Sequence, residues 1–502
     1  MINFPFTILA LAEFNPLEKK HWEESPTEVN RQNLDQVIAN AKLSIPIDIF
    51  LNQNKFSFFI DIREFKHFHP DTLLKSQQPL KKLWEALEFI KKTKLPPREI
   101  QKKLQKLYGI YVEFEESQKK NLKKGTSLID EILQKVALPE DMSFSQSCQV
   151  QIENQIKLIL EEIYKNKIFK CAEIVWRSLK FLLSLASNNI LIKVINTDKG
   201  SLIDVLENLL PYLIKNPPSI ILIDFPFKAS SYDIEVLEKI ASIAETILVP
   251  IIAWVDKEFF FLKTWDEFDH LPYLPHLFET DSYIKWRQFQ KTTKANWIAL
   301  GCNEFLLRYP YGPDNPLSVS FVEKNSYLWA SPVWAIAALI IKSFIKNGWP
   351  TVFSSKQTEI ENLPLRIIDN YASPLKKPFS EERIWQLTKS HLIPLCGILN
   401  KDKLFILADP TCGSTSLSYQ LFISRIIQFL LLWKEKVEGK IKFNQASQRL
   451  KQDFYKFWEK TGHFPPEIEI SEFSEKQILK IKIMPPYEIL SYNKIIELEL
   501  PW

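Results

Sequence analysis

The chain has 502 residues, of which 46% are hydrophobic and 25% charged, so it has room for roughly two to four domains and can bury a core. Its net charge of +4 is too small to indicate a nucleic-acid partner, and we interpret the lysines as spread along the chain rather than gathered in one segment. The five cysteines are scattered without a C-x-x-C pair, which favours a reduced, cytoplasmic protein.

Glycine is scarce, with only 10 residues in the chain, and the closest two are Gly301 and Gly312. Loops that cradle phosphate need two or three glycines within a few positions, because the backbone must approach the anion closely. The sequence therefore predicts no P-loop, no dinucleotide site and no cofactor. The apolar run IIQFLLLW at 426–433 is too short to span a bilayer as a helix, so we expect no membrane insertion.

The first segment of the chain alternates between strand and helix patterns. Residues 6–14 (FTILALAEF) are β-like and are predicted to form a first strand, not part of a signal peptide. Leu34, Val37 and Ile38 share one face of a predicted helix. Further along the segment, the patterns predict strands at 43–51 and 56–62 and helices at 70–76, 79–92 and 96–109. A charged stretch, which includes residues 116–126, follows as a predicted linker.

The second segment continues with helices and then changes to short apolar runs between helices. Three β-branched runs at 189–196, 219–225 and 247–254 are typical of fully buried strands, and helical patterns separate them. This order predicts a mixed α/β (α+β) fold, with a parallel or mixed sheet covered by helices. Later elements are predicted as a buried helix at 327–348, further helices from 418 to about 460, and three strand-like runs at 465–473, 478–490 and 492–502.

Three local patterns suggest chemistry, and each has a simpler structural interpretation. His67 and His69 could form half of a metal site, but no third ligand lies nearby and we expect them to pack or cap locally. Arg308 is expected to be a structural arginine that forks onto a carboxylate or onto backbone carbonyls. Cys412, in DPTCGSTS at 409–416, lacks the context of a catalytic nucleophile and is expected in a polar loop. We predict no catalytic and no metal-binding residues.

Two further interpretations stay open at the level of sequence. Trp176 with Arg177 is either a cation–π pair or a packed helix face. An enzyme with a site around His391, Cys396 and Cys412 is the alternative to a structural or interaction protein.

The opening segment resembles a known family. Residues 1–115 carry PFTILALAEFNP, NLDQVIANAKLSIPIDI and IREFKHFHPDTLL, and they resemble the small sheath subunit (TssB/VipA) of the type VI secretion system. Residues 127–502 carry CAEIVWRSLKFLL, NEFLLRYPYGPDN, YLWASPVWAIAALIIKSFIKNGW and MPPYEILSYNKIIELELPW, and they resemble the large sheath subunit (TssC/VipB). The two subunits are normally separate chains, and here they are fused.

The resemblance implies a division of the chain and a function. It implies a small-subunit-like domain at 1–115, a linker at 116–126, N-terminal helices of the large-subunit part at 127–175 and a large-subunit-like domain at 176–502. It implies copies that polymerise into a contractile helical tube around an Hcp-like inner tube and that contact baseplate components. The terminal strands at 3–14 and 488–500 become candidates for pairing between subunits. A non-contractile scaffold or assembly factor is the alternative.

The stretch SLIDEIL at 127–133 resembles the pattern by which a ClpV-like AAA+ unfoldase recognises the large subunit. A short amphipathic helix that docks into a groove is compatible with this role. An ordinary packed helix is the alternative. The residues that the resemblance assigns to unfoldase binding are Leu128, Ile129, Asp130, Glu131, Ile132 and Leu133.

Overall fold

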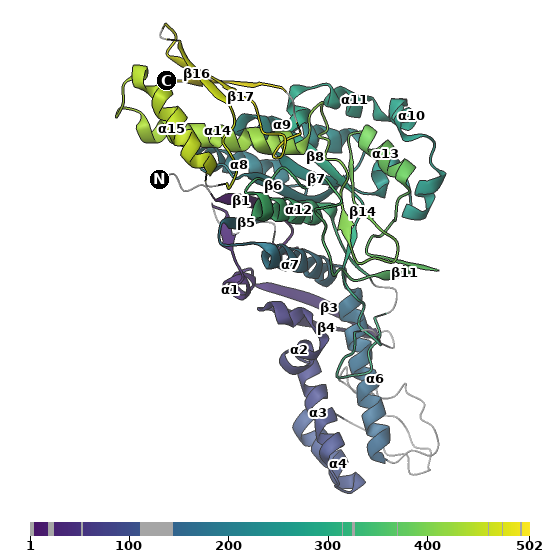
Figure 1. Ribbon diagram of the computed structural model, residues 1–502. Coiled ribbons are helices and arrows are strands. Elements are labelled where there is room, and N and C mark those ends of the chain that lie inside the picture. The colour runs from purple at the N-terminus through teal and green to yellow at the C-terminus, as the bar shows by residue number, and fades with distance from the viewer. Residues whose placement is uncertain are drawn as a thin grey trace.

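The computed structural model describes residues 5–18, 25–51, 54–110, 144–313, 315–323, 327–368, 370–459, 461–473, 475–491 and 494–502. Within them the predicted mixed α/β fold is confirmed (Figure 1). The predicted linker at 116–126 and the residues Leu128–Leu133 lie outside the described residues. Across the described ranges, no helix combines the length and the apolar character that a membrane crossing would need.

A seven-stranded sheet forms the centre of the molecule, and its strand order is β13-β8-β7-β6-β1-β5-β2. Six strands pair in parallel and the edge strand β2 is antiparallel to β5. The strands are β1 (Phe6–Ala12), β2 (Thr27–Val29), β5 (Ile190–Asn196), β6 (Ile220–Phe227), β7 (Ile251–Val255), β8 (Ile298–Cys302) and β13 (Ile393–Pro394). The N-terminal strand β1 therefore lies between two strands that come about 180 to 220 residues later in the chain.

Helices cover both faces of this sheet. The side chains of Ile8, Ala10 and Ala12 on β1 belong to one core, together with α7 (Lys167–Leu185) and α12 (Pro332–Asn347). Leu9 and Leu11 belong to a second core on the opposite face, with α8 (Leu202–Lys215) and α9 (Ser231–Ile247). Because β1 is buried on both faces, its side chains are apolar except that of Thr7, as expected for an interior parallel strand.

The predicted helix at 327–348 is two elements in the structure. Residues Leu328–Ala330 form the short strand β10, which pairs with β9 (Phe305–Arg308), and α12 begins only at Pro332. Proline at the first position of a helix has a suitable φ and needs no hydrogen-bonded N–H, so it favours a start at this residue. The predicted run at 478–490 likewise ends as a strand at Ile483, before Pro485 and Pro486.

A helical arm projects from the sheet (Figure 1). It consists of α2 (Pro70–Ser76), α3 (Leu80–Lys92), α4 (Pro97–Lys103), the π-helical turn η2 (Leu104–Tyr108) and α6 (Phe144–Lys165). Between the arm and the sheet lie α1 (Leu34–Asn40), the hairpin β3 (Leu43–Leu51) and β4 (Asn54–Ile62), and the 3-10 turn η1 (Phe65–Phe68). Helices α3 and α6 pack against each other through apolar faces, so both segments of the chain build the arm.

The expectation that the lysines are spread along the chain is wrong for the arm. Residues 75–106 contain ten lysine and arginine residues and only three glutamates, so lysines do gather in one segment. The clustering of the lysines is not obvious from the sequence, because they alternate with the buried apolar residues of α3, α4 and η2.

The C-terminal part forms a third core. The long helix α14 (Leu417–Val437) and α15 (Ala446–Glu459) pack under a small antiparallel sheet, with Trp349 and Trp458 fully buried between them. The sheet consists of β16 (Ile468–Phe473), β17 (Ile478–Ile483) and β18 (Ile496–Pro501), in that order. The remaining helices near the second core are α10 (Leu274–Glu279), α11 (Ile284–Gln290) and α13 (Glu381–Lys389).

Short two-stranded ladders and 3-10 turns complete the described elements. The ladders include β11 (Arg366–Ile368) with β12 (Tyr371–Ser373), and β14 (Cys396–Gly397) with β15 (Leu404–Phe405). The 3-10 turns are η3 (Lys257–Phe260), η4 (Trp265–His270), η5 (Asp281–Tyr283), η6 (Thr293–Trp297) and η7 (Phe443–Gln445).

Candidate functional site

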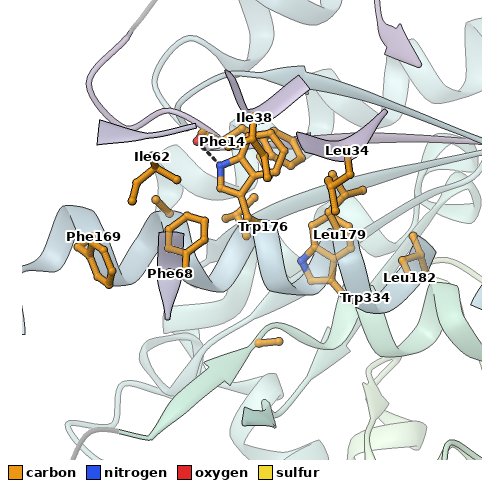
Figure 2. Packing of buried hydrophobic residues seen from close by; sticks show 14 of the residues in the cluster. Phe14, Leu34, Ile38, Ile62, Phe68, Phe169, Trp176, Leu179, Leu182 and Trp334 are labelled. Atoms are coloured by element: carbon orange, nitrogen blue, oxygen red, sulfur yellow. Dashed lines mark hydrogen bonds between the residues drawn. The ribbon is translucent and has the colours of Figure 1, made fainter. Parts of the chain in front are cut away.

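The junction between the N-terminal segment and the rest of the chain is built on Trp176. Its ring on α7 is fully buried, and its Nε1–H donates a 3.0 Å hydrogen bond to the carbonyl oxygen of Phe14. The Phe14 and Trp176 rings meet edge to face at 5.0 Å, and Figure 2 shows them with Ile38 and Phe68. Trp176 is therefore a packed helix face. The cation–π contact belongs to Arg177, whose guanidinium lies 5.3 Å from the ring of Phe65.

A buried ionic cluster lies next to this packing. The guanidinium of Arg308 donates to both oxygens of Glu173, at 2.8 and 3.1 Å, and to both oxygens of Glu323, at 2.6 and 3.2 Å. Arg177 adds a 2.6 Å bond to Glu173. The prediction that Arg308 is a structural arginine forking onto a carboxylate is confirmed. Sequence reasoning missed both carboxylates, because Glu173 lies 135 positions away in the chain.

The protonation state of Glu173 follows from its neighbours. Burial alone would raise the pKa of Glu173, but the attraction of Arg308 and Arg177 holds it below its ordinary value. Glu173 is therefore ionised at neutral pH inside the fold. Removal of Arg308 would leave this carboxylate in an apolar environment, which is costly.

Side chains of the N-terminal segment reach the same cluster. His69 accepts a 3.2 Å hydrogen bond from the backbone N–H of Asp71, which caps α2, and its ring lies 5.3 Å from that of Tyr311. His67 accepts from the backbone N–H of Arg63 at 3.1 Å. The expectation that the two histidines pack or cap locally is confirmed, with His69 as the cap of α2 and His67 buried. Over the described ranges, no group of three His, Cys, Asp or Glu side chains is placed to hold a metal ion.

Polar contacts extend the junction beyond the cluster. Asp71 accepts a 3.0 Å bond from the N–H of Ser318, and Tyr164 donates to the carbonyl of Phe68 at 2.8 Å. Arg31 donates to backbone carbonyls at the end of α7. Together with the pairing of β1, these contacts hold residues 5–110 on the remainder of the chain through one shared core.

The DPTCGSTS loop does not present a nucleophile. Cys412 is fully buried and its backbone N–H donates to the carbonyl of Ile298, while Ser414 and Thr415 bond to Asn296. Burial raises the pKa of the Cys412 thiol well above its ordinary value, so it stays protonated and weakly reactive.

The other residues of the alternative enzyme site are equally inert. Burial raises the pKa of Cys396 to about 12, and its thiol faces the carbonyl of Pro394 at 3.5 Å. His391 contacts the backbone carbonyl of Thr411 through Nδ1, at 3.1 Å. The three residues therefore form no thiolate nucleophile with an adjacent base.

The two terminal strands have different surroundings. Both edges of β1 are already paired within the chain, with β5 and β6, so the expectation that residues 3–14 pair between subunits is wrong for Phe6–Ala12. Strand β18 pairs only with β17 among the described residues, and its second edge is open. On the outer face of this sheet Lys482 pairs with Glu497 at 2.9 Å. The β16–β18 sheet is therefore the candidate for strand addition.

Comparisons with known proteins match both segments of the chain. One family model, "Type VI secretion system, VipA, VC_A0107 or Hcp2", matches residues 1–124. Another, VipB ("EvpB/VC_A0108, tail sheath N-terminal domain"), matches residues 215–413. The chain joins a VipA-type and a VipB-type sheath domain in one polypeptide. Residues 1–124 are called the VipA-like segment and residues 215–413 the VipB-like segment below.

A curated relative supports the second assignment. The type VI secretion system sheath protein TssC1 of Pseudomonas aeruginosa is 26% identical over 195 residues, which cover 36% of this chain and 39% of that protein. The chain thus spans about two fifths of the length of this relative.

Solved sheath structures show a weaker likeness. The contracted helical sheath of the anti-feeding prophage aligns with a TM-score of 0.36 and 10% identity, over 64% of this chain and 76% of that chain. A sheath tail protein from Desulfitobacterium hafniense aligns with a TM-score of 0.35 and 6% identity, over 60% of each chain. Because both TM-scores lie below 0.5, the assignment rests on the family models and on TssC1.

Proposed function

We propose that this chain is a structural subunit of the type VI secretion system contractile sheath. Copies would polymerise into a helical tube around an Hcp-like inner tube, and the tube would shorten to drive the inner tube outward. One observation carries the proposal: β1 of the VipA-like segment pairs within one sheet with β6 of the VipB-like segment on one side and with β5, which precedes that segment, on the other. One fused chain would thus supply a complete protomer, without a separate partner subunit.

This role requires no active site. The glycine-poor sequence, the protonated buried thiols and the structural arginine all support a non-enzymatic, cytoplasmic protein. Repeated heterologous contacts, each with the same rotation and rise, generate a helical tube. Packed interfaces with two stable arrangements allow such a tube to extend and contract.

The open edges of the β16–β18 sheet support strand addition between protomers. An added strand forms main-chain hydrogen bonds along an exposed edge, which can hold a lattice while its connections still hinge. Because β16 and β18 flank β17 and neither pairs with another strand among the described residues, a strand from a neighbour could join either edge. The baseplate would nucleate the first ring of protomers.

For recycling, we propose that a ClpV-like AAA+ unfoldase binds Leu128–Leu133, as the resemblance of SLIDEIL implies. A peptide of residues 121–137 should bind the unfoldase N-domain, and the same peptide with Leu128→Asp plus Ile132→Asp should not. Equal binding by both peptides would contradict this role.

Electron microscopy tests the sheath proposal directly. The chain is purified alone and together with an Hcp-like inner-tube protein, and both samples are imaged in negative stain. Helical tubes or cogwheel-shaped cross-sections are expected, at least in the presence of the inner tube. Monomers or small closed oligomers in both samples would contradict the proposal and favour a non-contractile scaffold.

A further inference from the structure

The helical arm carries a strong positive charge at one end of the molecule. Residues 75–106 hold ten basic and three acidic residues, a net charge of +7 in a chain whose total is +4. All ten basic side chains are exposed, whereas the apolar residues of α3 and α4 face inward. The rest of the chain therefore carries a net charge of −3, so the excess of positive charge is concentrated on the arm.

An aromatic groove lies on this arm. Its volume is about 530 Å³, and the rings of Trp84, Phe89 and Tyr108 line it together with Lys92 and Lys103. The Phe89 and Tyr108 rings are 6.3 Å apart, and the ammonium of Lys103 lies 5.7 Å from the Phe89 ring. Glu85 and Glu88 also line the groove, and Glu88 pairs with Lys92 at 2.6 Å. The groove therefore has an aromatic lining, with Lys92 and Lys103 and two glutamates at its rim.

A surface of opposite character covers η4, α10 and α13, and we call it the acidic face. Residues 256–281 hold seven carboxylates and two lysines, a net charge of −5. The exposed carboxylates of the acidic face are Asp266, Asp269, Glu279, Glu381 and Glu382.

Two aromatic side chains stand out from the acidic face. Trp385 is 50% exposed and Tyr273 is 39% exposed, and their ring centroids lie 6.3 Å apart. The guanidinium of Arg383 donates hydrogen bonds to the backbone carbonyls of Asp269, Leu271 and Pro272. Two lysines also belong to this surface: the ammonium of Lys389 lies 5.2 Å from the Trp385 ring, and Lys377 pairs with Asp269 at 2.5 Å. The acidic face therefore presents an aromatic centre with an excess of carboxylates around it.

The arm and the acidic face lie at opposite ends of the molecule (Figure 1). They cannot meet within one chain, but they can meet between two copies. We infer that the acidic face of one copy docks on the arm of the next, with Trp385 in the aromatic groove and Glu381 facing the lysines at its rim. A contact between two different surfaces of the same chain is heterologous and continues from copy to copy. The inference deepens the proposed function, because it names one of the contacts from which a tube would grow.

The acidic face of a second copy supplies both an aromatic ring for the groove and carboxylates that can pair with Lys92 and Lys103. Its charge is opposite to the net charge of +7 on residues 75–106. Buried aromatic anchors with a charged rim are also typical of the residues that dominate protein interfaces.

Charge reversal tests the contact in the full chain. The arm variant is Lys92→Glu plus Lys103→Glu, and the face variant is Glu279→Lys plus Glu381→Lys. Sedimentation and electron microscopy measure the protein concentration at which copies associate. Each variant should raise this concentration at least ~10-fold, because like charges then face each other. A chain with all four changes should recover to within ~3-fold of the unaltered chain, because the pairing is restored in reverse.

A second variant tests the aromatic anchor without changing charge. Trp385→Ala should raise the concentration for association at least ~10-fold, as expected for a central aromatic anchor. Phe464→Ala, which truncates a side chain that is 93% exposed, is the matched control and should have no effect. Lys436→Glu plus Lys440→Glu, on exposed lysines of the α14 end, is the control for charge reversal. Circular dichroism confirms that each variant is folded.

The outcomes separate this contact from the sheath proposal. Tubes that form equally well with the arm, face and Trp385 variants would overturn the docking inference and leave the sheath proposal standing. If the chain forms only small oligomers, and charge reversal weakens them while the variant with all four changes restores them, the docking inference is supported and the sheath proposal is contradicted. Copies that stay monomeric at every concentration would overturn both. A fourth outcome concerns nucleic acid. If nucleic acid co-purifies with the unaltered chain but not with the arm variant, and self-association is unchanged, the arm binds a polyanion and the docking inference is overturned.

Discussion

At the scale of single residues, the junction depends on a few buried polar groups. The sequence could predict that Arg308 forks onto a carboxylate or onto backbone carbonyls, because a lone arginine after an apolar run has few other ways to be buried. It could not identify Glu173 or Glu323, since no local pattern links positions that meet only in the folded chain. The same holds for Trp176, whose partner Phe14 lies 162 positions away.

Replacing Arg308 with methionine tests the ionic cluster. Arg308→Met removes the positive charge that two buried carboxylates share, and it should lower the free energy of unfolding by about 3–5 kcal/mol. Urea unfolding followed by circular dichroism measures this loss. Arg449→Met is the matched control, because Arg449 forms an exposed ion pair with Asp453, and it should cost about 0.5 kcal/mol or less. Equal losses in the two variants would contradict the role of the cluster.

His69 should make the junction sensitive to acid. Burial lowers the pKa of His69, and the repulsion of Arg177 and Arg308 adds to this effect. The unfolded chain then binds a proton more readily than the folded chain, so stability falls as the pH drops below about 6.5 and through the lowered pKa.

The variant His69→Asn isolates this effect, because asparagine keeps the cap on α2 and does not titrate. The drop in melting temperature between pH 8 and pH 5 should be smaller in this variant than in the unaltered chain. His270→Asn, at an exposed histidine, should leave the drop unchanged. The same drop in His69→Asn and the unaltered chain would contradict the assignment.

At the scale of elements, β1 shows which features of a strand the sequence predicts and which it does not. The apolar run at 6–14 predicted a strand, and the structure confirms one at Phe6–Ala12. Its place between β5 and β6 could not be predicted, because an interior parallel strand carries no local signal that names its neighbours. Family resemblance placed the same strand at an interface between subunits, and in this chain that pairing occurs within one molecule.

Cutting the connection between the segments tests the shared core. A protease site introduced within residues 116–126 should give two fragments that co-elute in gel filtration, because β1 and the junction hold them together without the covalent link. The same cut in a chain with Ile8→Asp, which places a charge in the core beside β1, should release the fragments. Separation of the unaltered fragments under native conditions would show that the covalent link is required.

At the scale of the whole molecule, two cores cover the faces of the seven-stranded sheet, a third core lies against the β16–β18 sheet, and the arm projects from one end. The mixed α/β fold class followed from the order of strand and helix patterns, whereas the collection of positive charge on the arm did not. Lysines spaced over 32 residues look dispersed in the sequence, and only the packing of α3 and α4 against α6 turns them outward together. The predicted boundary around residues 116–126 likewise divides the sequence but not the core, since both sides contribute to the sheet and to the arm.

The central claim is that one fused chain is one complete sheath protomer. A cryo-electron microscopy reconstruction of tubes grown from this chain around an Hcp-like inner tube would test it most directly. The claim predicts one chain in the repeating unit, with β1 paired to β5 and β6 of its own molecule. Tubes that need an additional separate small or large subunit, or a sheet in which β1 comes from a neighbouring copy, would contradict it.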